Sequence, residues 1–150
     1  MTNTLLWIED DPNDILLGER ALQKSGFPKP VIIRDGEEAI AYLSGRDAYE
    51  DRTRYPLPSL ILSDLKLPRV SGFDVLRWLR DQEGLRRIPV IILTSSRQRR
   101  DIDMAYDCGA NAYLVKPIES KILVELFQSL ATFWVKHNAN PEISLNPLVR

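Results

Sequence analysis

Acidic residues follow two apolar runs of this chain, each at the point where the run ends. Asp64 comes directly after Leu60–Ser63, and Glu9 and Asp10 come directly after Leu5–Ile8. Runs this short and this apolar are typical of strands buried on both faces of a sheet. Because ligand sites of open parallel sheets lie just outside the carboxyl ends of the strands, we expect these carboxylates to meet. Mg2+ prefers oxygen ligands, so the pattern predicts a Mg2+ site.

A hydroxyl group and an amine fall at the ends of two further apolar runs. Thr94 ends the run Val90–Thr94, and Lys116 follows the run Ala112–Val115. Together with an acidic site, these groups suit phosphoryl transfer to a carboxylate. Such a nucleophile needs a metal ion and a cation beside it, because an anion must attack an anion.

Each of these residues has a predicted role. Asp64 follows the central predicted strand, so we interpret it as the nucleophile. Lys116 is predicted to pair first with Asp64 and then with the phosphoryl group, to which Thr94 donates a hydrogen bond. The predicted Mg2+ ligands are Glu9, Asp10, Asp64 and the backbone carbonyl of Lys66.

Each signal has a simpler explanation when it is taken alone. An acidic turn before Pro12 is typical of a helix N-terminus, and Asp64 could cap a helix or a turn. Thr94 could be an ordinary β-branched strand residue. The carboxylates, the hydroxyl and the lysine all fall at the ends of predicted strands, and none falls in the middle of one. This coincidence favours a functional site.

The elements that must position these residues alternate regularly. Strands are predicted over 5–8, 31–34, 60–63, 90–94 and 112–115, and helices from Pro12 to Gly26, from Gly36 to Gly45, from Gly72 to about Gly84, over 97–108, and from Pro117 to about Lys136. Alternation of this kind predicts a parallel sheet with right-handed crossovers and helices on both faces. The expected fold class is a doubly wound α/β domain.

Composition sets further bounds. The 150 residues, 44% of them hydrophobic, suit one domain with a real core. A net charge of −1 gives no general attraction to nucleic acid or anionic membranes. No signal peptide or membrane span is visible, and the single Cys108 fits a reducing compartment, so we expect a soluble cytoplasmic protein. Two segments are longer than a minimal domain of this class needs: the polar stretch 46–55 and the tail 138–150. The tail is expected to be extended or docked on a partner. The predicted domain is therefore 1–137.

Four ordered motifs carry a resemblance to a known family. They are Ile8-Glu9-Asp10-Asp11, Ser63 to Pro68 followed by Gly72, Leu93-Thr94-Ser95, and Tyr113 to Pro117. Over about residues 4–135 the chain resembles the receiver domain of two-component response regulators, of the type found in chemotaxis regulators. The resemblance implies the strand order 2-1-3-4-5 with five helices. It also implies a phosphoryl group passed from a histidine kinase to Asp64, and a cis Lys116–Pro117 bond.

The resemblance also implies a switch and partners. Thr94 turns toward the phosphate and Tyr113 turns inward, which changes the face made by helix four, strand five and helix five. The last helix carries a broad apolar stripe, and we expect a homodimer to which Phe127, Phe133 or Trp134 contributes, although the whole stripe could instead be core. The long loop over 46–55 and the Phe133-Trp134 ending resemble the single-domain regulators of bacterial, especially cyanobacterial, phytochrome kinases.

Two other functions are weighed against this one. An aspartyl-nucleophile phosphatase or phosphotransferase would use similar groups, but that class has a second Asp two residues after the nucleophile, and this chain has Lys66 there. DNA binding through Arg97, Arg99 and Arg100 is the second alternative. Three arginines near one helix start are more typical of a solvated face, so no nucleic-acid partner is expected.

Overall fold

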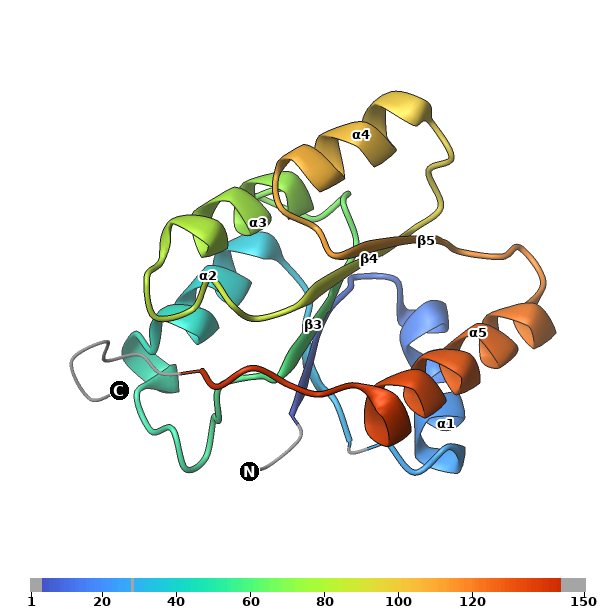
Figure 1. The fold of residues 1–150 in the computed structure, drawn as a ribbon, viewed down its shortest axis with the longest axis horizontal. Helices are drawn as coiled ribbons and strands as arrows, with labels where there is room; N and C mark the ends of the chain where they lie inside the picture. Colours follow the sequence, from blue (N-terminus) through green and yellow to red (C-terminus); the bar gives the residue numbers. More distant parts are fainter. Residues whose placement is uncertain (1–3, 28, 144–150) are drawn as a thin grey trace.

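A five-stranded parallel sheet forms the centre of the computed structural model, which describes residues 4–27 and 29–143. Its strands are β1 (Leu5–Ile8), β2 (Val31–Ile33), β3 (Leu60–Ser63), β4 (Val90–Thr94) and β5 (Ala112–Val115). They lie in the order β2-β1-β3-β4-β5 (Figure 1), and register pairs such as Leu6 with Ile61 and Ile92 with Tyr113 align them. The predicted fold class and strand order are confirmed.

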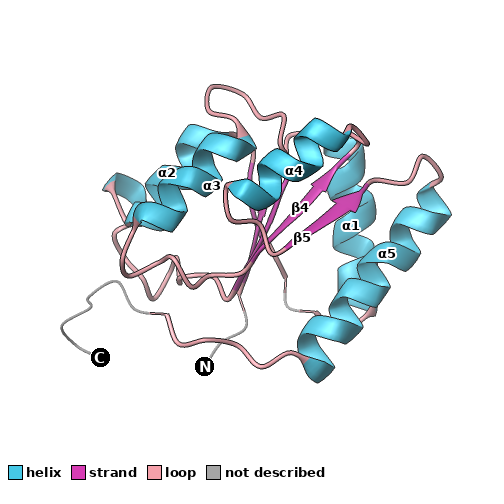
Figure 2. Ribbon diagram, turned by 45° about the horizontal axis from the view of Figure 1, so that its top comes forward, coloured by secondary structure: helices cyan, strands magenta, loops and turns pink. Residues whose placement is uncertain are grey.

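Helices cover both faces of this sheet. They are α1 (Pro12–Lys24), α2 (Gly36–Ser44), α3 (Gly72–Asp81), α4 (Arg99–Asp107) and α5 (Ser120–Thr132), with a short 3-10 helix (Asp47–Tyr49) after α2 and a π-helical turn (Phe133–His137) after α5. Helices α1 and α5 lie on one side, and α2, α3 and α4 lie on the other (Figure 2). Helix α4 begins two residues later than predicted, because the amide of Gln98 binds the Ser96 hydroxyl oxygen in a loop.

Alternate side chains of the strands fill two core layers. In β1, Leu6 and Ile8 point into the layer beneath α2, α3 and α4, whereas Leu5 and Trp7 point into the layer beneath α1 and α5. This alternation follows from the two-residue period of a strand. Both layers are apolar, so the polar residues that matter chemically must lie where the strands end.

The polar stretch over 46–55 packs against α2. The guanidinium of Arg52 donates hydrogen bonds to the carbonyl oxygens of Tyr42, Leu43 and Tyr55 at 2.8, 2.9 and 3.1 Å. The first two carbonyls belong to the last turn of α2, whose carbonyl groups lack helical partners. This segment therefore caps a helix in addition to any role in binding.

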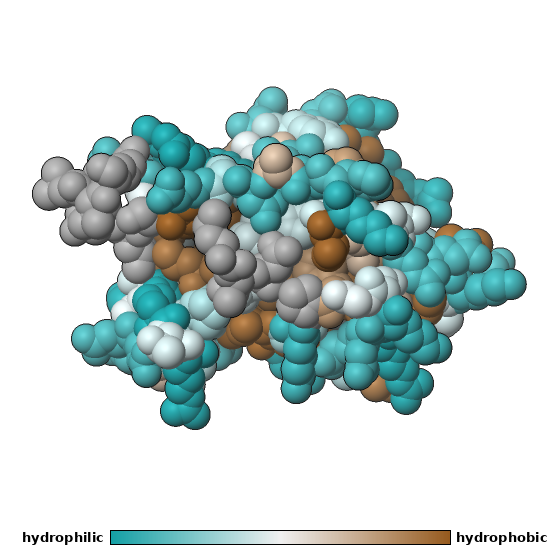
Figure 3. Space-filling view, turned by 60° about the horizontal axis from the view of Figure 1, so that its bottom comes forward, coloured by the Kyte–Doolittle hydropathy of each residue, from teal (hydrophilic) through white to brown (hydrophobic). Residues whose placement is uncertain are grey.

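The chain after His137 has no regular secondary structure up to Ile143, whose side chain packs against the core layer of α2, α3 and α4. The remainder of the predicted tail, 144–150, lies outside the described residues. The face drawn in Figure 3 is mainly hydrophilic, with small separate apolar areas among the described residues. Within 4–27 and 29–143, no helix has the length and apolar character needed to cross a membrane.

The expected cis bond between Lys116 and Pro117 is wrong for this structure. Every peptide bond among the described residues is trans, including this one. Trans is the lower-energy isomer of a bond preceding proline. Lys116 reaches its position from a trans backbone, held by a 2.7 Å hydrogen bond from its amide to the carbonyl oxygen of Thr94.

Candidate functional site

The ammonium of Lys116 lies between three carboxylates at the carboxyl end of the sheet. Its Nζ is 2.6 Å from Glu9 Oε1, 2.9 Å from Asp14 Oδ2 and 3.0 Å from Asp64 Oδ2. The Lys116 side chain is only 10% exposed, and that of Glu9 is 1% exposed. The predicted pair of Lys116 with Asp64 is therefore present, within a larger cluster that we call the Lys116 cluster: Glu9, Asp14, Asp64 and Lys116.

Glu9 is held in place by the turn that follows β1. Its Oε2 accepts hydrogen bonds from the backbone amides of Asp10 and Asp11, both at 3.1 Å. Asp11 in turn caps α1, because its Oδ1 accepts from the amides of Asn13 and Asp14. The acidic turn thus has both of the explanations considered for it: Asp11 starts the helix, while Glu9 faces the site.

Asp64 is fixed by the loop that follows β3. Its Oδ1 accepts a 2.6 Å hydrogen bond from the amide of Leu65, and the amide of Lys66 lies at 3.4 Å. Gly72 closes this loop with a hydrogen bond from its amide to the carbonyl oxygen of Leu65 at 2.8 Å. A Cβ atom on Gly72 would lie 2.1 Å from the carbonyl oxygen of Asp64, so a larger residue does not fit there.

The Lys116 cluster has an excess of negative charge. Three carboxylates and one ammonium carry a formal charge of −2. Burial raises the pKa of Glu9 even though Lys116 opposes this shift. Burial by itself would lower the pKa of Lys116, but its bonds to Glu9 and Asp14 raise it above its ordinary value. The two shifts have different causes: burial away from water raises the pKa of Glu9, whereas contact with carboxylates raises the pKa of Lys116.

Thr94 and Tyr113 lie next to this cluster on neighbouring strands. Thr94 ends β4 with a buried side chain that is 1% exposed. Tyr113 is half-buried on β5, and its hydroxyl donates a 3.0 Å hydrogen bond to the carbonyl oxygen of Ser96 in the loop before α4. The Ser96 hydroxyl donates to Asp101 on α4 at 2.5 Å. In this arrangement Tyr113 holds the loop that connects Thr94 to α4.

The predicted metal ligands are only partly assembled. Glu9 and Asp64 meet at Lys116, whereas Asp10 is exposed. The fourth predicted ligand, the backbone carbonyl of Lys66, belongs to the loop that follows β3. Within the described parts of the chain, no group of three or more His, Cys, Asp or Glu side chains is arranged to hold a metal ion. Mg2+ is usually held by one or two carboxylates with waters and phosphate oxygens, so these donors and their surplus negative charge fit that ion.

Asp14 is the member of the cluster that sequence reasoning missed. It lies in the first turn of α1, and its side chain is 22% exposed. An acidic residue in a first turn is usually explained by the helix dipole. The one available signal was its position next to the strand-end carboxylates, in a helix that begins at that edge of the sheet.

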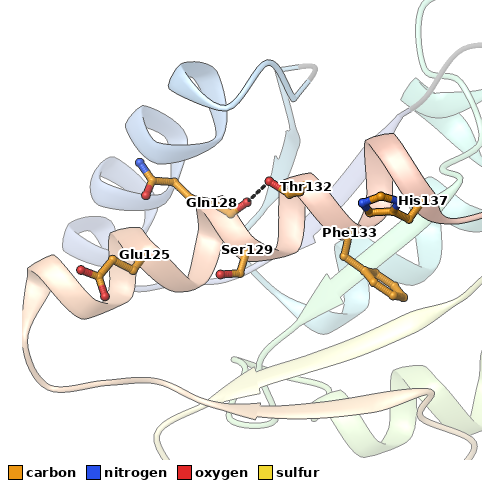
Figure 4. A pocket seen from close by; sticks show the side chains of 6 residues that line it. All are labelled: Glu125, Gln128, Ser129, Thr132, Phe133 and His137. Atoms are coloured by element: carbon orange, nitrogen blue, oxygen red, sulfur yellow. Dashed lines mark hydrogen bonds between the residues drawn. The ribbon is translucent and has the colours of Figure 1, made fainter.

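Of the three predicted interface residues, only Phe133 is exposed. Phe127 is 1% exposed and packs against Trp7 with ring centroids 5.2 Å apart, and Trp134 is 4% exposed. These two side chains belong to the core, which corrects the expectation that they face a partner. Phe133 is 56% exposed. It borders a shallow pocket of about 510 Å³ at the end of α5 (Figure 4), which is lined by Glu125, Gln128, Ser129, Thr132, Phe133 and His137.

The arginines near the start of α4 lie on an exposed surface. Arg99 is 3.6 Å from Asp103 one turn along the helix, and Arg100 donates a 2.8 Å hydrogen bond to Gln98. Arg97 is also exposed. Neighbouring acidic and amide groups partly satisfy Arg99 and Arg100, which is typical of a solvated helix face.

A doubly wound sheet with a buried carboxylate, a lysine and a buried threonine at its carboxyl edge is the arrangement expected for a receiver domain. The chain belongs to the response regulator receiver domain family, whose model matches residues 5–128. The resemblance carried by the four motifs is thereby confirmed.

Individual relatives agree with this assignment. The response regulator Rcp1 of Synechocystis is 36% identical over 133 residues, which cover 88% of this chain and 88% of Rcp1. The phosphorylated cyanobacterial phytochrome response regulator RcpA superposes with a TM-score of 0.88 at 34% identity, over 95% of this chain and 100% of RcpA. A Mn2+-bound form of Rcp1 gives a TM-score of 0.87 at 34% identity, over 94% and 100% of the two chains.

Proposed function

We propose that this chain is a phosphoacceptor that receives a phosphoryl group on Asp64 from the phosphohistidine of a histidine kinase. A carboxylate oxygen of Asp64 forms the new O–P bond while the P–N bond to the imidazole breaks. The electron pair of that bond goes to the imidazole, which takes up a proton. The product is an acyl phosphate, whose hydrolysis would return Asp64 to its resting state.

The Lys116 cluster is the observation that carries this proposal. Asp64 Oδ2 lies 3.0 Å from an ammonium at the edge of the sheet, while its Oδ1 is fixed by the amide of Leu65. A nucleophile in this position meets an incoming anion beside a cation that is already desolvated. Electrostatic stabilisation of this kind is the main contribution that a protein makes to phosphoryl transfer.

The same proposal includes a bound Mg2+ ion. Glu9, Asp10, Asp64 and the backbone carbonyl of Lys66 would hold it, and the surplus negative charge of the cluster supports a divalent cation. When bound, the ion would offset the charge that builds up on the phosphoryl oxygens. The relative Rcp1 has a Mn2+-bound form, which supports a divalent metal ion in this chain as well.

Thr94 and Tyr113 are proposed to convert phosphorylation into a change of surface. The Thr94 hydroxyl would donate a hydrogen bond to a phosphoryl oxygen. This movement of Thr94 would displace the loop after β4, to which the Tyr113 hydroxyl is hydrogen-bonded at Ser96. Release of this hydrogen bond would free Tyr113 to turn inward. The face made by α4, β5 and α5 would then differ between the two states.

The partner proposed is a histidine kinase of the bacterial phytochrome type, because the relative RcpA is a phytochrome response regulator. A cytoplasmic location follows from this role and suits the single Cys108. We also propose a homodimer through α4, β5 and α5, supported by the exposure of Phe133 and of Ile122 on α5. Lys66, at the position where an aspartyl phosphatase has its second Asp, argues against turnover of a free substrate.

Intact mass after incubation with acetyl phosphate and Mg2+ tests the proposal. The wild-type chain should gain one phosphoryl group. Asp64→Asn should gain none, and neither should the wild type when EDTA replaces Mg2+. The matched control is Asp107→Asn, an exposed aspartate at the end of α4, which should react like the wild type. Equal labelling of the Asp64→Asn variant would exclude Asp64 as the acceptor.

A further inference from the structure

Lys116 has three partners in the resting site, and two of them are required elsewhere during the proposed reaction. Its ammonium carries three N–H donors, and the three contacts to Glu9, Asp14 and Asp64 match that number. The proposed metal ion needs oxygens of Glu9 and Asp64. The phosphoryl group needs Asp64 and then an N–H group of Lys116. Of the three carboxylates, only Asp14 is needed neither by the metal ion nor by the phosphoryl group.

The placement of Asp14 suits a lasting contact with Lys116. Its amide is bound by Asp11 at the start of α1, so the backbone of this first turn is fixed relative to the strand-end carboxylates. Its Oδ2 lies 2.9 Å from Nζ, and its side chain is 22% exposed against 11% for Asp64. Asp14 thus approaches the ammonium from the helix, while the other two carboxylates approach it from the sheet.

We infer that Asp14 is a positioning residue that keeps the ammonium of Lys116 beside Asp64 while the metal ion and the phosphoryl group occupy the other oxygens. This inference rests on the proposed function. Without Asp14, the ammonium has only Glu9 and Asp64 as partners, and these are the carboxylates that the metal ion requires. Loss of Asp14 therefore hinders both metal binding and phosphorylation, through Lys116.

The sign of the rate change separates positioning from simple charge. Acetyl phosphate is an anion, so removal of a negative charge near Asp64 would by itself speed the reaction. Asp14→Asn should instead react about tenfold more slowly, because without Asp14 the Lys116 ammonium is no longer held in the position that the reaction needs. Asp14→Glu, which retains the carboxylate, should recover most of the rate. Glu19→Gln removes the same charge further along α1 and should stay within about twofold of the wild type.

Binding of Mn2+ alone, measured by calorimetry on the full chain, gives a readout that needs no phosphorylation. Asp14→Asn should weaken Mn2+ binding about tenfold when Lys116 is present, the low end for residues that orient a metal ligand. In a Lys116→Met background the same change should weaken Mn2+ binding by less than about threefold, since only the lost negative charge of Asp14 then acts and no ammonium remains to be redirected.

Several outcomes would overturn the inference. An equal loss of Mn2+ affinity in both backgrounds would show that Asp14 acts without Lys116. A wild-type or faster reaction of Asp14→Asn with acetyl phosphate would show that it acts as a charge or not at all. Failure of the proposed function looks different: the wild type itself would then take up no phosphoryl group on Asp64, whereas the Mn2+ comparison would still decide the role of Asp14.

Discussion

Replacement of Lys116 by methionine tests the electrostatic account of the site. In the folded chain its ammonium lies 2.6, 2.9 and 3.0 Å from three carboxylate oxygens, and its side chain is 10% exposed. Methionine keeps most of the apolar length but leaves the carboxylates without a cation. Removal of one partner of a buried ion pair costs about 3–5 kcal/mol, and because Asp14 retains some contact with water we expect about 3 kcal/mol.

This loss should depend on pH with a defined sign. Burial raises the pKa of Glu9, and the opposing effect of Lys116 is absent in the variant. Glu9 of the folded variant therefore keeps its proton at pH values above 4.5, the ordinary pKa, where the unfolded chain has released it. The free energy of unfolding of the variant therefore decreases as pH rises from there through the folded pKa. The contribution of Lys116 to the wild type is complete below its ordinary pKa of 10.5 and is lost only as pH rises through its higher folded pKa.

The difference in stability between the two proteins should therefore be small near about pH 5 and largest near about pH 8. Urea unfolding followed by circular dichroism, with EDTA present, measures it. Lys121→Met on the exposed side of α5 is the control and should change stability by less than about 0.5 kcal/mol. A loss below about 1 kcal/mol at pH 8, or a loss that grows as pH falls, would refute the account of the Lys116 cluster.

Four further variants test other parts of the fold. Gly72→Ala should destabilise the chain by about 1–3 kcal/mol in urea unfolding and slow phosphorylation, since its Cβ would lie 2.1 Å from a backbone oxygen of the Asp64 loop. Arg80→Met should lose about 3 kcal/mol, because the guanidinium donates to carbonyl groups in the loops before β4 and β5. Trp134→Ala should lose about 3–5 kcal/mol, whereas Phe133→Ala should lose less than about 1 kcal/mol and weaken the dimer in sedimentation equilibrium. A dimer unchanged by Phe133→Ala would remove that side chain from the interface.

The strands and the central part of the site could be predicted because both depend on topology. Parallel strands connected through helices place all their carboxyl ends at one edge of the sheet, so Glu9, Asp64, Thr94 and Lys116 had to lie near one another. The apolar runs that mark β1, β3, β4 and β5 ended at the predicted residues. No side-chain contact had to be known for these conclusions.

The position of Asp14 and the burial of Phe127 and Trp134 could not be predicted, because they depend on local rotation about a helix axis. The side chain of Asp14 reaches Lys116 because the Asp11 cap fixes where α1 begins, and a shift of one residue would turn it away by about 100°. A broad apolar stripe on α5 does not reveal which of its members is covered. Trp134 is buried within a π-helical turn, in which the angular spacing of residues differs from that of an α-helix.

The resting geometry of Tyr113 sets the size of the proposed switch. One hydrogen bond, from its hydroxyl to the carbonyl oxygen of Ser96, holds it in place, and a bond of this kind contributes about 0.5–1.5 kcal/mol net. A charge-assisted bond from Thr94 to a phosphoryl oxygen contributes about 1.5–3 kcal/mol. The stronger of these two hydrogen bonds would form only in the phosphorylated state, so phosphorylation would shift the balance between the two positions of Tyr113 by up to about two powers of ten. A switch of this size would be graded. A partner, or a second copy of the chain, that bound the proposed α4, β5 and α5 face with a preference of about the same size for one position of Tyr113 would therefore shift Tyr113 as far as the phosphoryl group would.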